Sequence, residues 1–359
     1  MRKQYRVGVI GATGMVGQRF VTLLADHPWF NITAVAASSR SAGQPYGQAV
    51  AGRWMMPTPV PQSVAQLTVL NATQVDEVAR QVDFVFCAVE MDAAATRELE
   101  DSYARAGIPV VSNNSAHRGT PDVPMLIPEI NPQHLEVIPA QQRRLGSQRG
   151  FVVVKPNCSL QSYVPAIHAL MEFEPTEILA CTYQAISGAG KAFDTWPEMV
   201  DNVIPYIAGE EAKSEQEPLK IWGQVEGGAI RPAQSPRIAT QCIRVPVSDG
   251  HLAAVFVNFA KKPSREEILA RWATYQGEPQ QLRLPSAPQP FIQYLSAADR
   301  PQTKLDRDFG YGMGITVGRL RADTIFDYKF VCLSHNTLRG AAGGAILNAE
   351  LLAAKGYFD

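Results

Sequence analysis

The chain has 359 residues, of which 46% are hydrophobic and 19% are charged, a composition typical of globular rather than disordered proteins. The 33 basic and 34 acidic side chains give a net charge of −1, which provides no electrostatic basis for binding nucleic acid. The length predicts two domains of ordinary size.

The N-terminal residues 1–6 lead directly into a short strand pattern and lack the apolar core of a signal peptide. No apolar run approaches the length of a membrane span. The cysteines are odd in number, scattered and without Cys-x-x-Cys spacing, which argues against a disulfide framework and a zinc site. We therefore predict a cytoplasmic protein with no membrane or nucleic-acid partner and no metal.

The first part of the chain alternates strand and helix patterns. Strands are predicted at residues 6–10, 31–37, 82–88 and 108–112, and helices at residues 15–26 and 92–106. This alternation predicts the α/β class, with a Rossmann-type doubly wound parallel sheet. The predicted first domain comprises residues 1–157.

The second part, residues 158–336, is predicted to be an α+β catalytic and dimerisation domain. A helix is expected at residues 159–173, followed by strands at 177–184, 241–246 and 252–259. The charged, glycine-rich stretch 209–234 is expected to be loop and short helix that covers a site or an interface. A final helix over residues 337–355 is expected to return to the first domain, which residues 337–359 would complete.

A glycine-rich turn joins the first strand to the first helix, in the run Gly11-Ala-Thr13-Gly14-Met15-Val16-Gly17. Such glycines allow a tight turn and let a pyrophosphate approach backbone amides at the helix N-terminus. We predict a dinucleotide site here, the alternative being a simple glycine-rich turn.

The second strand is followed by Ser38, Ser39, Arg40 and Ser41, with no acidic residue. Hydroxyl groups and an arginine suit the 2′-phosphate of NADP, whereas an acid would favour NAD. The alternative is a polar surface turn.

Cys158 follows a β-branched strand and Pro156, and precedes an apolar helical stretch. Unpaired backbone amides at such a junction favour the thiolate, which is the nucleophilic form of cysteine. The alternative is a buried structural cysteine.

Further candidates lie at strand ends in the second part. His251 follows a glycine turn and could transfer protons, although a structural turn residue is equally consistent with its position. Arg244 could bind a carboxylate, and Gln184 could orient a carbonyl or a water. The turn beginning Ser187-Gly188 could approach a flat cofactor ring. Arg118, after a strand of the first sheet, could hold a phosphate or lie in a surface ion pair.

Together these motifs resemble the aspartate-semialdehyde dehydrogenase family, especially its archaeal and fungal branch, over nearly the whole chain. The landmarks are Gly11-Ala-Thr-Gly14-Met-Val-Gly17, Ser39-Arg-Ser-Ala-Gly43, Pro156-Asn-Cys158-Ser, Gln184-x-x-Ser187-Gly-Ala-Gly190, Asp201-Asn-Val-Ile-Pro-Tyr-Ile-x-Gly-Glu-Glu211, Arg244-Val-Pro-Val-x-x-Gly-His251 and Asn336-x-x-Arg-Gly-Ala-Ala342.

The resemblance implies reduction of L-aspartyl-4-phosphate by NADPH, within lysine, threonine and methionine biosynthesis, by a homodimer or homotetramer. Cys158 would be the acyl-forming nucleophile, assisted by Gln184, with His251 as acid and base. The implied substrate-binding residues are Arg118 and Lys220 for phosphate, Glu217 for the amino group, Arg244 for the α-carboxylate, and Asn157. Asn336 would approach the nicotinamide. The alternatives are a malonyl-CoA reductase-like enzyme and a non-catalytic nucleotide-binding protein.

Overall fold

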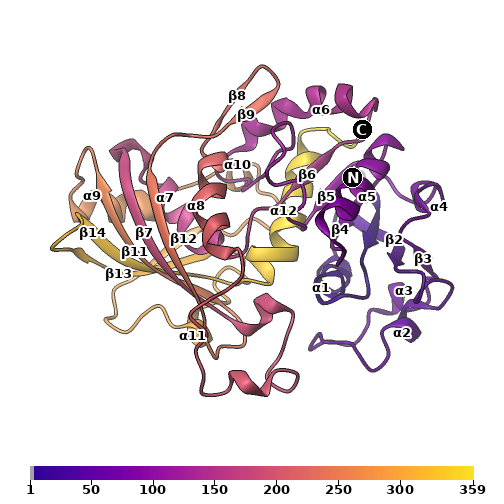
Figure 1. Cartoon of the computed structure of the whole chain (residues 1–359), viewed down its shortest axis with the longest axis horizontal. Coiled ribbons are helices and arrows are strands. Elements are labelled where there is room, and N and C mark those ends of the chain that lie inside the picture. The colour runs from indigo at the N-terminus through magenta and orange to yellow at the C-terminus, as the bar shows by residue number, and fades with distance from the viewer. Residues whose placement is uncertain (1–3) are drawn as a thin grey trace.

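The computed structural model describes residues 4–359. Residues 1–3 lie outside the described part, so the start of the predicted first domain and of the predicted absence of a signal peptide fall outside it. Residues 4–359 form two six-stranded sheets and a short two-stranded one. In Figure 1 the first sheet lies at the right in indigo and violet, and the second at the left, mostly in orange and yellow. Helix α12 lies between them in this view.

The first sheet is entirely parallel and has the strand order β3-β2-β1-β4-β5-β6. Its strands are β1 Tyr5–Ile10, β2 Phe30–Ala37, β3 Val69–Asn71, β4 Phe84–Cys87, β5 Val110–Ser112 and β6 Val152–Val154. The order reverses between β1 and β4, and doubly wound sheets bind ligands at such a switch point, beyond the carboxyl ends of the strands. The predicted fold class is confirmed for this part of the chain.

Six helices accompany this sheet: α1 Met15–Leu24, α2 Tyr46–Ala49, α3 Gln62–Ala65, α4 Val75–Ala79, α5 Ala93–Arg105 and α6 Ile138–Leu145. Helix α5 begins where expected because the Asp92 carboxylate caps it, accepting hydrogen bonds from the amides of Ala94 and Ala95. Helix α1 has no side-chain cap, so the amides of its first turn point out from the helix end without intrahelical acceptors.

The second sheet is mixed and has the order β10-β7-β11-β14-β13-β12. Its strands are β7 Pro175–Gln184, β10 Arg237–Arg244, β11 His251–Phe259, β12 Ile292–Leu295, β13 Ile315–Ala322 and β14 Tyr328–Ser334. The helices near it are α7 Leu160–His168, α8 Glu210–Ile221, α9 Arg265–Thr274, α10 Glu278–Gln281 and α11 Thr303–Asp306. Strand β7 is central to the site because it ends at Gln184, while its neighbour β11 begins at His251.

The expectation for residues 209–234 was wrong in one respect. Instead of loop and a short helix, the stretch begins with the twelve-residue helix α8, and a hairpin of β8 (Gln224–Glu226) and β9 (Ala229–Arg231) follows. Helix α8 buries Glu210, Ser214, Glu217 and Ile221, which recur at helical spacing on one face of the helix. Because most side chains of α8 are charged or polar, its hydrophobic residues did not reveal this buried face.

The last helix was also predicted too long, as regular helix begins only with α12 (Gly343–Ala354). The preceding segment Leu338–Ala342 is irregular, with Ala341 outside helical dihedral angles. Gly340 lies so close to Cys158 that a Cβ atom there would be 2.9 Å from the cysteine Cβ. Helix α12 then packs into the hydrophobic cluster of β1 and β4. Among residues 4–359, no helix is long and apolar enough to cross a membrane.

Candidate active site

Cys158 lies between the end of β6 and the start of α7, with its side chain partly buried. Asn157 shapes the turn, because its side-chain oxygen accepts hydrogen bonds from both the amide and the hydroxyl of Ser159, each 2.8 Å long. Burial raises the pKa of the Cys158 thiol, as does the Glu210 carboxylate, while Lys155 and Arg118 lower it. The expected preference for thiolate is thus outweighed by burial, and the ionisation of Cys158 depends on the nearby cations.

His251 lies beside the cysteine, with its Nε2 atom 3.4 Å from Cys158 Sγ. Its other ring nitrogen, Nδ1, accepts a hydrogen bond of 3.1 Å from the Ala185 amide. Because Nδ1 is an acceptor, the neutral ring carries its proton on Nε2 and directs that proton at the sulfur. Burial, together with the charge of Arg244, lowers the His251 pKa to about 3. The ring is therefore a neutral hydrogen-bond donor to Cys158.

Glu210 joins several site residues and was not identified from the sequence as a site residue. Its carboxylate accepts hydrogen bonds from the Asn157 amide group at 2.9 and 3.0 Å and from Gln184 Nε2 at 3.4 Å. Lys213 forms an ion pair with it at 2.9 Å. The helical spacing of buried residues in α8 could have indicated Glu210, once α8 was recognised as a full helix.

Arg244 and Gly188 also lie close to His251. The buried Arg244 donates a 2.7 Å hydrogen bond from Nη1 to the Ala185 carbonyl. Ala185 therefore orients the Arg244 guanidinium through its carbonyl and the His251 imidazole through its amide. A Cβ atom at Gly188 would lie 2.9 Å from Arg244 Nη1 and 3.0 Å from His251 Nε2. Only glycine leaves both side chains where they are.

Arg118 and Glu217 form a partly buried ion pair of 3.1 Å. Arg118 also donates to the carbonyls of Lys155 at 3.0 Å and Asn113 at 3.4 Å. Glu217 accepts a 2.6 Å hydrogen bond from the amide of Asn157. The pair therefore connects α8 and the segment after β5 to the turn that carries the cysteine.

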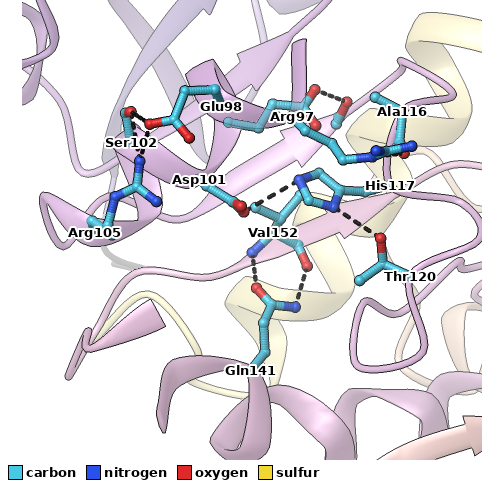
Figure 2. A network of polar contacts seen from close by, with 12 residues as sticks. Arg97, Glu98, Asp101, Ser102, Arg105, Ala116, His117, Thr120, Gln141 and Val152 are labelled. Atoms are coloured by element: carbon cyan, nitrogen blue, oxygen red, sulfur yellow. Dashed lines mark hydrogen bonds and ion pairs between the residues drawn. The ribbon is translucent and has the colours of Figure 1, made fainter. Parts of the chain in front are cut away.

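The segment that carries Arg118 is held by its neighbour His117 (Figure 2). The buried ring of His117 lies between Asp101 of α5, at 3.2 Å from Nε2, and the Thr120 hydroxyl, at 3.1 Å from Nδ1. In the same view Arg97 donates to the Ala116 carbonyl at 2.7 Å. Helix α5 thus holds the segment that carries Arg118 through contacts with Ala116 and His117.

Lys220 does not line the cavity beside Cys158. Its Nζ atom donates to the carbonyls of Arg118, Thr120 and Val123 at 2.7, 2.7 and 2.9 Å. Burial lowers its pKa to about 8. All three N–H groups of the ammonium are engaged by the backbone, so Lys220 fastens the Arg118 segment to α8.

Two adjoining cavities run along the carboxyl ends of the first sheet, and Glu90 lines both. The one beside Cys158, of about 340 Å³, is lined by Met15, Val16, Glu90, Asn113, Arg118, Lys155, Asn157, Cys158, Ser187–Gly190, Asn336, Thr337, Gly340 and Ala341. The other, of about 690 Å³, is lined by Gly11, Thr13, Gly14, Ala37–Ser41, Arg53, Asn71–Thr73 and Ala88–Met91. Predicted cofactor residues line both cavities, which we together call the channel, and Cys158 lines the smaller one.

The residues of the channel fit a dinucleotide. Gly11 has φ +85°, and a Cβ at Gly17 would lie 2.2 Å from the Gly11 carbonyl, so both glycines are required by the tight turn. A Cβ atom at Gly14 would make only ordinary contacts, 3.5 Å from the Gly11 carbonyl oxygen and 3.7 Å from Glu90 Oε1, so crowding does not require glycine there. At the far end Arg53, which the sequence did not indicate, donates a 3.0 Å hydrogen bond to the Ser41 hydroxyl. Asn336 faces the near end and donates to the Ser187 hydroxyl at 2.8 Å.

Comparisons with known proteins agree with this arrangement. Residues 6–138 match the family described as "Semialdehyde dehydrogenase, NAD binding domain", and residues 165–339 match "Semialdehyde dehydrogenase, dimerisation domain". Aspartate-semialdehyde dehydrogenase of Archaeoglobus fulgidus is 44% identical, covering 97% of this chain and 98% of that protein. That of Aspergillus fumigatus is 42% identical, with 98% of each covered.

A solved structure of aspartate semialdehyde dehydrogenase with NADP from Candida albicans superposes with a TM-score of 0.88 and 38% identity, covering 99% of this chain and 100% of that one. The resemblance noted in the sequence, including its archaeal and fungal character, is therefore confirmed. The chain belongs to the aspartate-semialdehyde dehydrogenase family.

Proposed function

We propose that this chain reduces L-aspartyl-4-phosphate with NADPH, yielding L-aspartate 4-semialdehyde, phosphate and NADP. The observation that carries the proposal is the contact of 3.4 Å between Cys158 Sγ and His251 Nε2, at the end of a channel shaped for a dinucleotide. Family membership supports the same activity.

In the first step the Cys158 thiolate, the form that the charges of Lys155, Arg118 and Arg244 favour, attacks the acyl carbon of the substrate. A C–S bond forms, the C–O bond to the phosphoryl group breaks, and phosphate leaves with that bonding pair. Arg244 is proposed to hold the α-carboxylate, since a guanidinium binds a carboxylate through two N–H groups. Glu217, with Glu210 close behind Asn157, is proposed to attract the amino group.

The second step converts the Cys158 thioester to the aldehyde. NADPH, when bound in the channel, would supply a hydride to the acyl carbon. The resulting tetrahedral oxyanion collapses, the C–S bond breaks, and the sulfur leaves as thiolate. His251 is proposed to stabilise that thiolate through Nε2–H, the atom already directed at the sulfur. Gln184 is proposed to orient the acyl group.

Residues at both ends of the channel are proposed to bind the cofactor. The amides of the first turn of α1 are proposed to bind the pyrophosphate. Ser38–Ser41 and Arg53 are proposed to bind the 2′-phosphate, which an acid in their place would repel. Ser187, Gly188 and Asn336 would lie against the nicotinamide.

The activity is tested with purified protein by following NADP reduction. We expect a rate that requires both L-aspartate 4-semialdehyde and phosphate, and a far lower rate with NAD. Reduction of NADP only with malonate semialdehyde and coenzyme A would show a different acyl-transfer enzyme. No reduction with either pair, while NADP still binds, would indicate a nucleotide-binding protein.

A homodimer or homotetramer in the cytoplasm is also proposed, on the grounds of the resemblance and the unpaired cysteines. Light scattering after size-exclusion chromatography would measure the number of copies directly. A monomer at the concentration used in the activity assay would contradict this part of the proposal.

A further inference from the structure

The cavity beside Cys158 contains a lysine to which the proposed steps assign no part. Lys155 directly follows β6, is 2% exposed and lines the cavity together with Arg118 and Cys158. Its Nζ atom donates to the Pro156 carbonyl, its only hydrogen-bond acceptor among residues 4–359. An ammonium group has three N–H donors, so two remain for a ligand. Burying a charge with free donors is unfavourable unless a ligand completes the site.

Lys220 provides an internal comparison, because it is a second buried lysine close to the same segment. Its three donors are all bonded to backbone carbonyls, and it does not line the cavity. The resemblance assigned phosphate binding to Lys220, yet the lysine with free donors at the cavity wall is Lys155.

The surroundings of Lys155 fix its position and concentrate positive charge. The Lys155 carbonyl accepts a 3.0 Å hydrogen bond from Arg118 Nε, so the two cations come from adjoining parts of the wall. Its carbon chain packs closely beside Gly344 of α12, where a Cβ atom would lie 3.2 Å from Lys155 Cδ. The absence of a side chain at Gly344 therefore leaves room for the carbon chain of Lys155.

We propose that Lys155 binds, together with Arg118, the phosphate group that Cys158 displaces. The inference rests on the proposed function for the identity of the leaving group. A phosphate dianion leaving the acyl carbon must emerge next to the sulfur, and this wall of the cavity holds two cationic side chains there. Charge-assisted hydrogen bonds from Lys155 and Arg118 would stabilise the dianion as its negative charge develops.

The same arrangement makes anion binding depend on pH. Burial, with help from Arg118, lowers the Lys155 pKa to about 7, while Cys158 and Glu217 act in the opposite direction and Arg339 adds to the lowering. The facing His251 has a pKa of about 3 and stays neutral. A bound dianion favours the charged lysine, so affinity is highest below pH 7 and falls as pH rises through that value.

Sulfate is the suitable probe because it stays dianionic across this range. Its binding is measured as protection of Cys158 from iodoacetamide, quantified on the Cys158 peptide by mass spectrometry. The rate with sulfate is divided by the rate without it at each pH, which removes the titration of the thiol itself. The variants are Lys155→Met and Lys155→Arg, with Lys261→Met as a control at a lysine that pairs with Glu174 on the surface.

For the unchanged protein and Lys261→Met, we expect the sulfate dissociation constant to rise about tenfold between pH 7.5 and 8.5. At pH 6.5 Lys155→Met should weaken sulfate binding by about 10- to 100-fold, as loss of a charge-assisted hydrogen bond does. The constant of Lys155→Arg should stay low and nearly independent of pH, which also excludes misfolding as the cause. Binding of sulfate by Lys155→Met within twofold of the unchanged protein would overturn the proposal.

Steady-state kinetics separate this inference from the proposed function. In Lys155→Met the KM for phosphate should rise at least tenfold, while the KM for L-aspartate 4-semialdehyde changes less than threefold. Equal increases in both constants would contradict a phosphate-specific role. If the unchanged protein shows no phosphate-dependent NADP reduction, the proposed function fails, yet the sulfate experiment still decides whether Lys155 binds a dianion.

Discussion

Replacing Gly188 with alanine tests the geometry on which the site depends. The new Cβ atom would lie 2.9 Å from Arg244 Nη1 and 3.0 Å from His251 Nε2, whereas ordinary contacts begin at 3.4 Å. Arg244, His251 or the turn must therefore move by about 0.5 Å, the difference between 3.4 and 2.9 Å. Gly188 does not have a positive φ, so the backbone itself tolerates alanine, and the crowding within the protein arises from these two contacts.

We expect kcat/KM of Gly188→Ala to fall by about 10- to 100-fold, because displacement of positioning groups by up to 1 Å is costly to catalysis. That loss corresponds to about 1.4 to 2.7 kcal/mol of transition-state stabilisation. The assay is phosphate-dependent NADP reduction, with unfolding measured in parallel. Gly47→Ala in α2 is the matched control, since its Cβ would make only ordinary contacts with Ala65. Activity of Gly188→Ala within twofold of the unchanged protein would refute this geometry.

Three other expectations follow from single contacts. His251→Asn should lower kcat by about 10²- to 10³-fold with little change in KM, as loss of a hydrogen-bond donor to a developing negative charge does. Because burial holds the His251 pKa near 3, the kcat of the unchanged protein should show no acidic limb near pH 6.5; such a limb, lost in His251→Asn, would contradict the neutral donor. Arg53→Met should raise the KM for NADP about tenfold or more and leave that for NAD unchanged; equal effects on both would remove Arg53 from the 2′-phosphate site. Lys220→Met should destabilise the fold by about 3 kcal/mol in denaturant unfolding, since three buried carbonyls lose their donor; a stable variant with a KM defect for phosphate alone would instead make Lys220 a phosphate ligand.

The first sheet was predictable because its signals are local. Alternation of strand and helix patterns predicted the parallel sheet, and the glycines after β1 reflect a turn that requires them. The residues after β2 line the larger cavity for the same reason, since parallel strands bring their carboxyl ends to one edge.

The parts that could not be predicted depend on contacts between distant segments. Glu217 and Lys220 lie three residues apart on one helix, yet their partners differ. Glu217 pairs with Arg118, whereas Lys220 donates to backbone carbonyls about 100 residues away in the sequence. Arg53 reaches Ser41 from a separate loop, and Lys155 acquires its surroundings only when Arg118 and Gly344 pack against it. The thiolate preference expected of Cys158 failed for a related reason, because burial is a property of the whole fold.

The central claim is that Cys158 carries the acyl group during turnover. The most direct measurement incubates the protein with L-aspartate 4-semialdehyde and NADP without phosphate, quenches it in acid and determines peptide masses. We predict an added aspartyl group on the peptide that contains Cys158, its loss when phosphate is supplied before quenching, and no adduct or turnover in Cys158→Ala, which should still bind NADPH. Normal turnover by Cys158→Ala, or an adduct on a different residue, would contradict the account.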